Sequence, residues 1–140
     1  MHEITWIGSN LGITNDKGGL EATQVGDFTV INVGEETKNP KADIIASLPL
    51  FNVPEDLLNK LATVIEEIVK DDNGGKSRVI IHDEFGIERS GLVAAWTIHK
   101  TSGISLDEAY SKIQEKNKKV VNYSSWIKFK EKEILEESST

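Results

Sequence analysis

The chain has 140 residues, of which 38% are hydrophobic and 28% charged, which is enough for one domain with an apolar core but too few for two. Its formal net charge of −7 argues against binding to nucleic acid, because such proteins present a basic surface to phosphates. The sequence contains no cysteine, which excludes disulfides, thiolate metal sites and a cysteine nucleophile.

No apolar stretch has the length that spans a membrane, and the N-terminus lacks the basic flank and apolar run of a signal peptide. We therefore expect a cytoplasmic protein that does not associate with membranes. Residues 1–140 are expected to form a single domain with a frayed tail at 136–140. A monomer is the default expectation.

The first part of the chain predicts short strands separated by turns. Residues 4–7 have the composition of a strand that ends at Gly8, and residues 12–19, rich in Gly, Asn and Asp, predict a loop. Residues 28–33 form a continuous β-branched and apolar run, which predicts a buried strand. Residues 43–50 predict a further strand, with a proline near its end.

The next element is the best-patterned helix of the sequence. Proline and two acids at residues 54–56 are typical of a helix start, and the acidic, Gly-rich residues 71–75 end it. Its apolar residues recur with a period of 3.6 and are Leu57, Leu58, Leu61, Val64, Ile65, Ile68 and Val69.

The last part of the chain predicts one more strand and three helices. The strand is residues 78–81, and the helix over 91–100 is apolar nearly all round, which indicates a buried helix. A capping box of Ser105 and Glu108 begins a helix that continues to residue 116. Residues 123–137 predict an amphipathic helix with Trp126, Ile127, Phe129 and Ile134 on its apolar face. Because the predicted strands lie mostly in the first part of the chain and the helices in the last part, the sequence predicts an α/β sandwich.

The segment between the last strand and the buried helix has the pattern of an anion-binding loop. Backbone N–H groups in a short turn with one glycine can converge on one point, and the helix N-terminus adds partial positive charge. A guanidinium at the mouth of the helix can hold a phosphate with two hydrogen bonds. The predicted loop consists of His82, Asp83, Glu84, Phe85, Gly86, Ile87, Glu88 and Arg89.

This segment resembles the signature of dual-specificity and protein tyrosine phosphatases, H-C-x-x-G-x-x-R-S/T. His82, Gly86, Arg89 and Ser90 match its fixed positions, and Asp83 stands where the family has its nucleophilic cysteine. The resemblance implies the cysteine-phosphatase fold, a three-layer α/β sandwich with a small central mixed sheet of four to five strands flanked by helices.

Other segments support the resemblance. Residues 103–109 are similar to the family's G-x-S-L-E-E-A run, and residues 30–33 are similar to its V-I-N-L strand. Asn122 and Trp126 resemble an asparagine and aromatic pair of its last helix. His82 is expected to bond to the loop backbone.

The resemblance also implies that a second catalytic group is missing. The family's general acid, an aspartate, aligns with Asn52, and an amide cannot protonate a leaving alkoxide. Glu55 and Asp56 lie nearby, but as acids of a first helical turn they have a simpler explanation. The sequence therefore predicts an inactive pseudophosphatase, without metal or cofactor, that acts by binding a partner protein or phosphoprotein.

Asp83 also changes the electrostatics of the loop. A phosphate there would lie about 4 Å from a fixed negative charge, which at an effective dielectric constant near 20 costs roughly 4 kcal/mol for each pair of unit charges. We therefore expect Asp83 to fill the loop as a built-in anion paired with Arg89.

Two alternatives stay open. The first is an active or residual phosphatase for phosphoprotein or a small phosphate ester, in which Asp83 and Arg89 act together. Asp83 would then form an aspartyl-phosphate with Mg²⁺ beside Glu84. The second is that Asp83 is an introduced replacement of a cysteine, although inactivation usually uses serine or alanine.

Lysines are concentrated in the last third of this acidic chain. They are explained most simply as solvated helical faces, and alternatively as a docking patch for an acidic partner. They are Lys112, Lys116, Lys118, Lys119, Lys128, Lys130 and Lys132.

Overall fold

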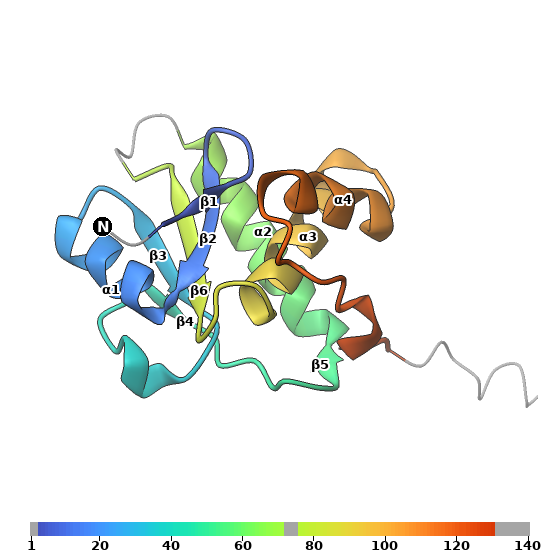
Figure 1. Cartoon of the computed structure of the whole chain (residues 1–140), viewed down its shortest axis with the longest axis horizontal. Coiled ribbons are helices and arrows are strands. Elements are labelled where there is room, and N and C mark those ends of the chain that lie inside the picture. Colours follow the sequence, from blue (N-terminus) through green and yellow to red (C-terminus); the bar gives the residue numbers. More distant parts are fainter. Residues whose placement is uncertain (1–2, 72–75, 131–140) are drawn as a thin grey trace, which may run out of the picture.

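A five-stranded sheet forms the centre of the computed structural model, which describes residues 3–71 and 76–130 (Figure 1). Its strand order is β1-β2-β6-β3-β4. Only β1 runs antiparallel to its neighbour, so the predicted mixed sheet is confirmed. The strands are β1 (Thr5–Trp6), β2 (Leu11–Asn15), β3 (Thr29–Asn32), β4 (Ile44–Ile45) and β6 (Val79–Asp83).

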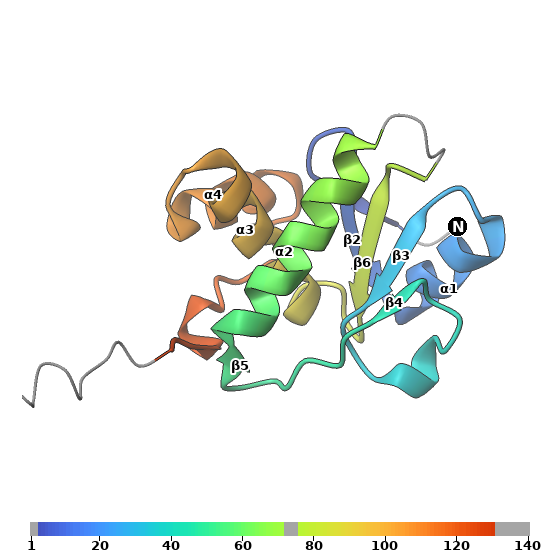
Figure 2. The same ribbon diagram turned by 180° about the vertical axis from the view of Figure 1, so that it is seen from behind.

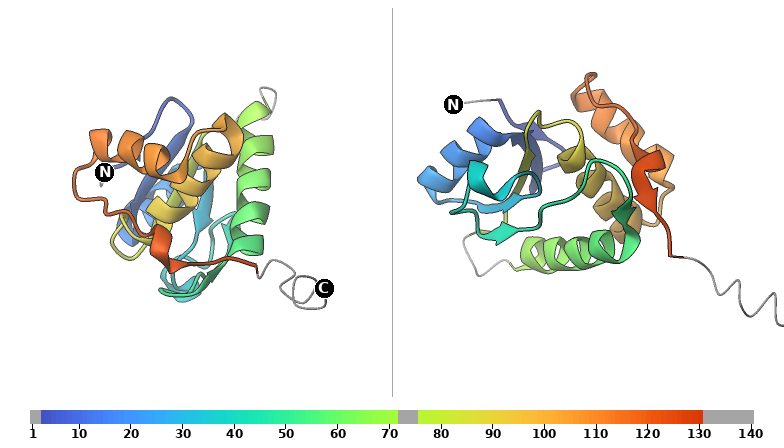
Figure 3. Two further views of the ribbon diagram at one scale, coloured as in Figure 1. Left: turned by 90° about the vertical axis from the view of Figure 1, so that its right-hand side faces the viewer. Right: turned by 90° about the horizontal axis from the view of Figure 1, so that it is seen from below.

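Helices cover both faces of the sheet and complete the predicted three-layer sandwich (Figure 3, right). Helix α1 (Asp16–Val25) lies on one face. Helices α2 (Glu55–Lys70) and α3 (Arg89–Ser102) cover the other face, where α2 runs obliquely across the strands (Figure 2). Helix α4 (Leu106–Lys116) packs on the outside of α3.

The alternation of β6 decides where the residues that follow it point. Val79 and Ile81 pack into the core under α2 and α3, whereas Ile80 packs with the smaller core under α1. Because successive side chains of a strand point to opposite faces, His82 turns toward α1 and Asp83 toward the start of α3. Two neighbouring polar residues are thus placed in two different layers.

The helices predicted from residue 54 to the acidic end at 71, over 91–100 and from Ser105 to residue 116 are confirmed. The buried residues of α2 include Leu58, Leu61 and Ile65 from the predicted stripe. Helix α3 is buried over most of its length, from Arg89 to Thr97. At the start of α4 the Ser105 hydroxyl accepts a hydrogen bond from the Glu108 N–H at 3.1 Å.

The predicted loop over residues 12–19 is wrong. Residues to Asn15 form β2, and α1 begins at Asp16 with the Asn15 side chain accepting a hydrogen bond from the Gly18 N–H. The glycines of this segment do not form a turn but allow neighbouring elements to pack closely. A Cβ atom on Gly12 would lie 2.8 Å from an Ile4 methyl, and one on Gly18 would lie 2.0 Å from the Thr14 hydroxyl.

Two further predictions are corrected. Of the strand predicted over 43–50, only Ile44–Ile45 forms a strand of the sheet, although the N–H groups of Ala46 and Leu48 still bond to the Asn32 and Val33 carbonyls. The described part of the helix predicted over 123–137 contains a 3₁₀ turn, η2 (Ser124–Trp126), and β7 (Ile127–Lys128). Strand β7 pairs in parallel with β5 (Val53–Pro54), a strand that was not predicted, and this pairing draws Ile127 out of a helical register. Residues 131–140, including the predicted frayed tail, lie outside the described residues.

A second 3₁₀ turn, η1 (Glu36–Lys38), follows β3. None of the helices in the described ranges is long and apolar enough to cross a bilayer.

Candidate functional site

The loop between β6 and α3, residues 84–88, folds back against the end of β2. Gly86 makes this possible in two ways. Its φ of +75° is one that side chains rarely adopt, and a Cβ atom on it would lie 2.5 Å from the Thr14 carbonyl carbon. The signature glycine is thus required by both conformation and space.

The Asp83 carboxylate lies inside this loop and is fully buried. One oxygen, Oδ1, accepts from the Gly86 N–H at 2.8 Å and from the Ser90 hydroxyl at 2.9 Å. The other, Oδ2, accepts from the Arg89 N–H at 2.8 Å. Arg89 and Ser90 are the first residues of α3, so the carboxylate satisfies the free N-terminus of that helix and meets its positive end.

The Arg89 guanidinium is nearly buried above the same carboxylate. Its Nε lies 3.7 Å from Asp83 Oδ2, close enough for an ion pair but too far for a hydrogen bond. Nη1 donates to the Leu48 carbonyl at 3.3 Å, whereas Nε finds no hydrogen-bond partner among the described residues. The Asp83–Arg89 pair is therefore made chiefly through the backbone N–H of Arg89.

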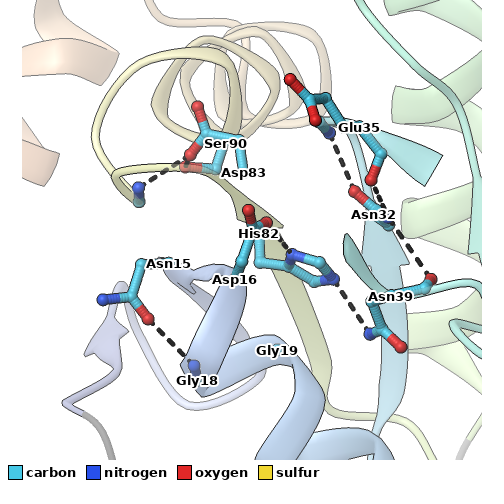
Figure 4. Close-up of polar contacts among 12 residues, drawn as sticks. Asn15, Asp16, Gly18, Gly19, Asn32, Glu35, Asn39, His82, Asp83 and Ser90 are labelled. Atoms are coloured by element: carbon cyan, nitrogen blue, oxygen red, sulfur yellow. Dashed lines mark hydrogen bonds and ion pairs between the residues drawn. The ribbon is translucent and has the colours of Figure 1, made fainter. Parts of the chain in front are cut away.

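His82 faces the opposite layer and is held on both sides (Figure 4). Its Nδ1 lies 3.0 Å from Asp16 Oδ1, and its Nε2 lies 3.1 Å from Asn39 Nδ2. A carboxylate can only accept and an amide nitrogen can only donate, so Nδ1 carries the proton and Nε2 accepts. The expected bonds from His82 to the loop backbone are replaced by these side-chain bonds.

Burial lowers the pKa of His82, and the hydrogen bond to Asp16 only partly offsets this effect. The folded protein therefore takes up a proton on His82 only at a lower pH than the unfolded chain, in which the ring is protonated below about pH 6.5. Stability is expected to fall as the pH drops below that value, with a slope of at most about 1.4 kcal/mol per pH unit from this group.

Two measurements check this expectation. Urea unfolding at pH 7.5, 6.5 and 5.5 gives the slope, and long-range ¹H–¹⁵N spectra give the tautomer. We expect a neutral ring at pH 7, with the proton on Nδ1. A ring that is half protonated at or above pH 6.5 contradicts the assignment.

No family model matches the chain, and no curated protein matches it. Solved structures do match the chain. Tk-PTP in its active form has 20% sequence identity and a TM-score of 0.66, with 88% of this chain and 90% of that chain covered. Human DUSP28 has 19% identity and a TM-score of 0.64, with coverage of 90% and 88%. The chain has the fold of the dual-specificity and protein tyrosine phosphatases.

A third solved structure with this phosphatase fold is the human tyrosine phosphatase-like serine/threonine/tyrosine-interacting protein. It has 17% identity and a TM-score of 0.66, with 90% of this chain and 91% of that chain covered.

Within this phosphatase fold, some of the predicted site residues lie together and others do not. Asp83, Arg89 and Ser90 form one hydrogen-bonded group. Glu84 and Phe85 are exposed on the outside of the loop. Ile87 and Glu88 are half-buried, and burial, followed by the nearby Asp83 charge, raises the pKa of Glu88.

Asn52, at the expected general-acid position, is exposed and has a positive φ of 57°. It lies between β4 and β5, four residues after Leu48, whose carbonyl accepts from Arg89. Glu55 begins α2 and accepts from the Lys130 N–H at 3.2 Å, in keeping with its interpretation as a first-turn acid. No group of three His, Asp or Glu side chains gathers as a metal site within residues 3–71 and 76–130.

The residues that support the loop from the α1 side are not predicted from the sequence. Asp16 and Asn39 hold His82, and Asn39 is itself fixed by Thr23, whose hydroxyl oxygen lies 3.0 Å from Asn39 Nδ2. Asn32 bonds to the Glu35 carbonyl and the Gly34 N–H and so shapes the turn after β3. The only signal for this network was the asparagine within the strand at residues 30–33.

Proposed function

We propose that this phosphatase-fold chain is catalytically silent and acts by binding a partner protein. The observation that carries the proposal is the occupancy of the loop by its own carboxylate. Asp83 already accepts from two backbone N–H groups and a hydroxyl, which are the kind of donors that hold a phosphate in such a loop.

A phosphate group would have to compete with this carboxylate for the same donors. At about 4 Å and an effective dielectric constant near 20, each pair of unit charges costs roughly 4 kcal/mol. The buried Arg89 offsets part of this cost, but its Nη1 donates to the Leu48 carbonyl. Substrate binding is therefore disfavoured before any chemical step.

The side chains at the catalytic positions also favour a catalytically silent protein. The 140 residues include no thiol, and the Asp83 oxygens are engaged by three donors, which lowers their reactivity as nucleophiles. Asn52 supplies no acidic proton at the position where the fold family is expected to place its acid. The similarity to a human phosphatase-like protein whose name describes it as interacting also favours a binding role.

Hydrolysis of a generic aryl phosphate tests the proposal. The native protein is expected to show no turnover above buffer, with or without Mg²⁺. Asp83→Cys is expected to gain turnover, because a thiolate at this helix N-terminus is a nucleophile in the geometry of the fold. Asp83→Ser, which has similar size and no thiolate, is the matched control and is expected to stay silent.

Turnover by the native protein would instead support the alternative, an active phosphatase. If the native protein hydrolyses the ester and Asp83→Ala abolishes the activity, the carboxylate is a nucleophile and the proposal is wrong. A requirement for Mg²⁺ in that case points to an aspartyl-phosphate intermediate.

A further inference from the structure

A groove of about 560 Å³ lies on the outer side of the loop whose inner side holds Asp83. One wall is formed by Phe85 and Ile87 of the loop. The other wall is the lysine turn, residues 116–119, which begins at the last residue of α4 and contains Lys116, Lys118 and Lys119. Glu3 is the one acidic side chain of its lining.

The lysine turn has a fixed backbone. Asn117 ends α4 through its N–H bond to the Ile113 carbonyl at 3.0 Å, and its side-chain oxygen accepts from the Lys119 N–H at 3.0 Å. Its side-chain nitrogen donates to the Thr5 hydroxyl at 3.1 Å, which ties the turn to β1, and both residues line the groove. The lysines are exposed on a preorganised frame, so binding to them loses little backbone entropy.

The wall formed by Phe85 and Ile87 is fixed from inside the loop. The Gly86 N–H bonds to Asp83, and the neighbouring Phe85 side chain points outward, with 61% of its surface exposed. Aromatic side chains are enriched in the cores of protein interfaces, which a polar rim surrounds. The groove thus pairs one apolar wall with one cationic wall.

We propose that this groove binds an acidic segment of a partner protein. Carboxylates of that segment would face the three lysines, and one of its apolar or aromatic side chains would pack on Phe85 and Ile87. The charges are complementary, because the residues that line the groove include three lysines and one glutamate although the chain has a net charge of −7. That overall charge disfavours extended polyanions such as nucleic acid or anionic membranes, but not a short segment.

The inference deepens the proposed function and rests on it, because it assigns the binding surface of a protein that acts by binding. The test uses a fluorescein-labelled random copolymer of glutamate and tyrosine as the probe. Fluorescence anisotropy at low salt measures its affinity for the native protein and for charge-reversal variants. Lys118→Glu with Lys119→Glu is expected to weaken binding about tenfold or more.

The matched control is Lys128→Glu with Lys130→Glu, which changes the net charge by the same amount on exposed residues outside the groove. It is expected to change the affinity less than about twofold. Glu3→Lys is expected to tighten binding and Phe85→Ala to weaken it about threefold or more. Equal weakening by both double reversals, or no effect of Phe85→Ala, overturns the proposal.

Other classes of ligand are further outcomes of the same assay. Single-stranded DNA or phosphatidylserine vesicles that bind more tightly than the copolymer, through Lys118 and Lys119, also overturn the proposal. The aryl phosphate assay distinguishes failure of the proposed function from failure of the groove proposal. Turnover by the native protein defeats the proposed function alone, whereas an inert protein that does not bind the copolymer defeats the groove alone.

Discussion

Replacing Asp83 by alanine is expected to lower the free energy of unfolding by about 3 kcal/mol. The carboxylate accepts from the Gly86 N–H, the Arg89 N–H and the Ser90 hydroxyl, and all three donors are buried. Each loses its acceptor in the variant, and α3 loses the negative charge at its N-terminus. The Arg89 guanidinium is also left without the anion beneath it. Urea unfolding at pH 7 in a phosphate-free buffer measures the change.

Two controls separate this effect from a general loss of acidic charge. Ser90→Ala removes one of the three bonds and is expected to cost about 1 kcal/mol. Asp56→Ala removes an exposed acid from the first turn of α2 and is expected to cost no more than about 1 kcal/mol. An Asp83→Ala cost no larger than that of Asp56→Ala contradicts the role assigned to the carboxylate.

Added anion gives the more decisive comparison. In Asp83→Ala the freed donors can take a phosphate or tungstate ion, and binding to the folded state alone stabilises it by about 2.7 kcal/mol at one hundred times the dissociation constant. The native protein is expected to gain little, because Asp83 already fills the position. Equal stabilisation of both proteins by phosphate contradicts the idea of a built-in anion.

Asp83 therefore connects the stability of the fold with the proposed function. The interactions that would hold a substrate phosphate instead hold the loop together from within. The ordered loop in turn presents Phe85 to the groove on its outer side. A chain whose role is binding can use such a loop as a scaffold, since the loop needs no ligand to be complete.

The part of the site that is continuous in sequence could be predicted, whereas the residues that hold His82 from other elements could not. Residues 79–90 form a strand, a turn and a helix in direct succession, so their geometry follows from local rules. The partners of His82 come from α1 and from residue 39, at sequence separations of 66 and 43 residues. Only tertiary structure, with α1 and the residue after η1 both placed beside β6, brings them together.

The errors of the sequence analysis have related causes. Glycine at positions 12, 18 and 19 predicts a turn, whereas in the fold Gly12 permits close contact of β2 with Ile4 and Trp6, and Gly18 and Gly19 permit close contact of α1 with β2 and β6. Near the C-terminus the apolar residues belong to different neighbours. Ile127 pairs with Val53, Trp126 contacts the Phe51 ring and Phe129 lies near Trp96. A helical period cannot reveal three separate contacts, because periodicity assumes one common face.

Gly19→Ala is expected to lower the free energy of unfolding by about 3 kcal/mol, although alanine is intrinsically the better helix former by about 1 kcal/mol. A Cβ atom on Gly19 would lie 2.1 Å from His82 Cδ2 and 2.3 Å from Cγ. The imidazole cannot move aside, because Asp16 and Asn39 hold both of its nitrogens. Helix α1 must therefore shift away from the sheet, and thermal or urea unfolding measures the cost.

The sign of this effect should reverse when the ring is removed. In a His82→Ala background, Gly19→Ala is expected to be neutral or to stabilise the protein by up to about 1 kcal/mol, because only the helix propensity is left. Gly26→Ala is the control: it lies at the C-terminal end of α1 with φ +83° and open space around its Cβ position. Its cost of about 1 kcal/mol comes from backbone strain and should be the same in both backgrounds. If Gly19→Ala costs as much without the His82 ring as with it, the close approach of α1 to His82 is not what requires glycine there.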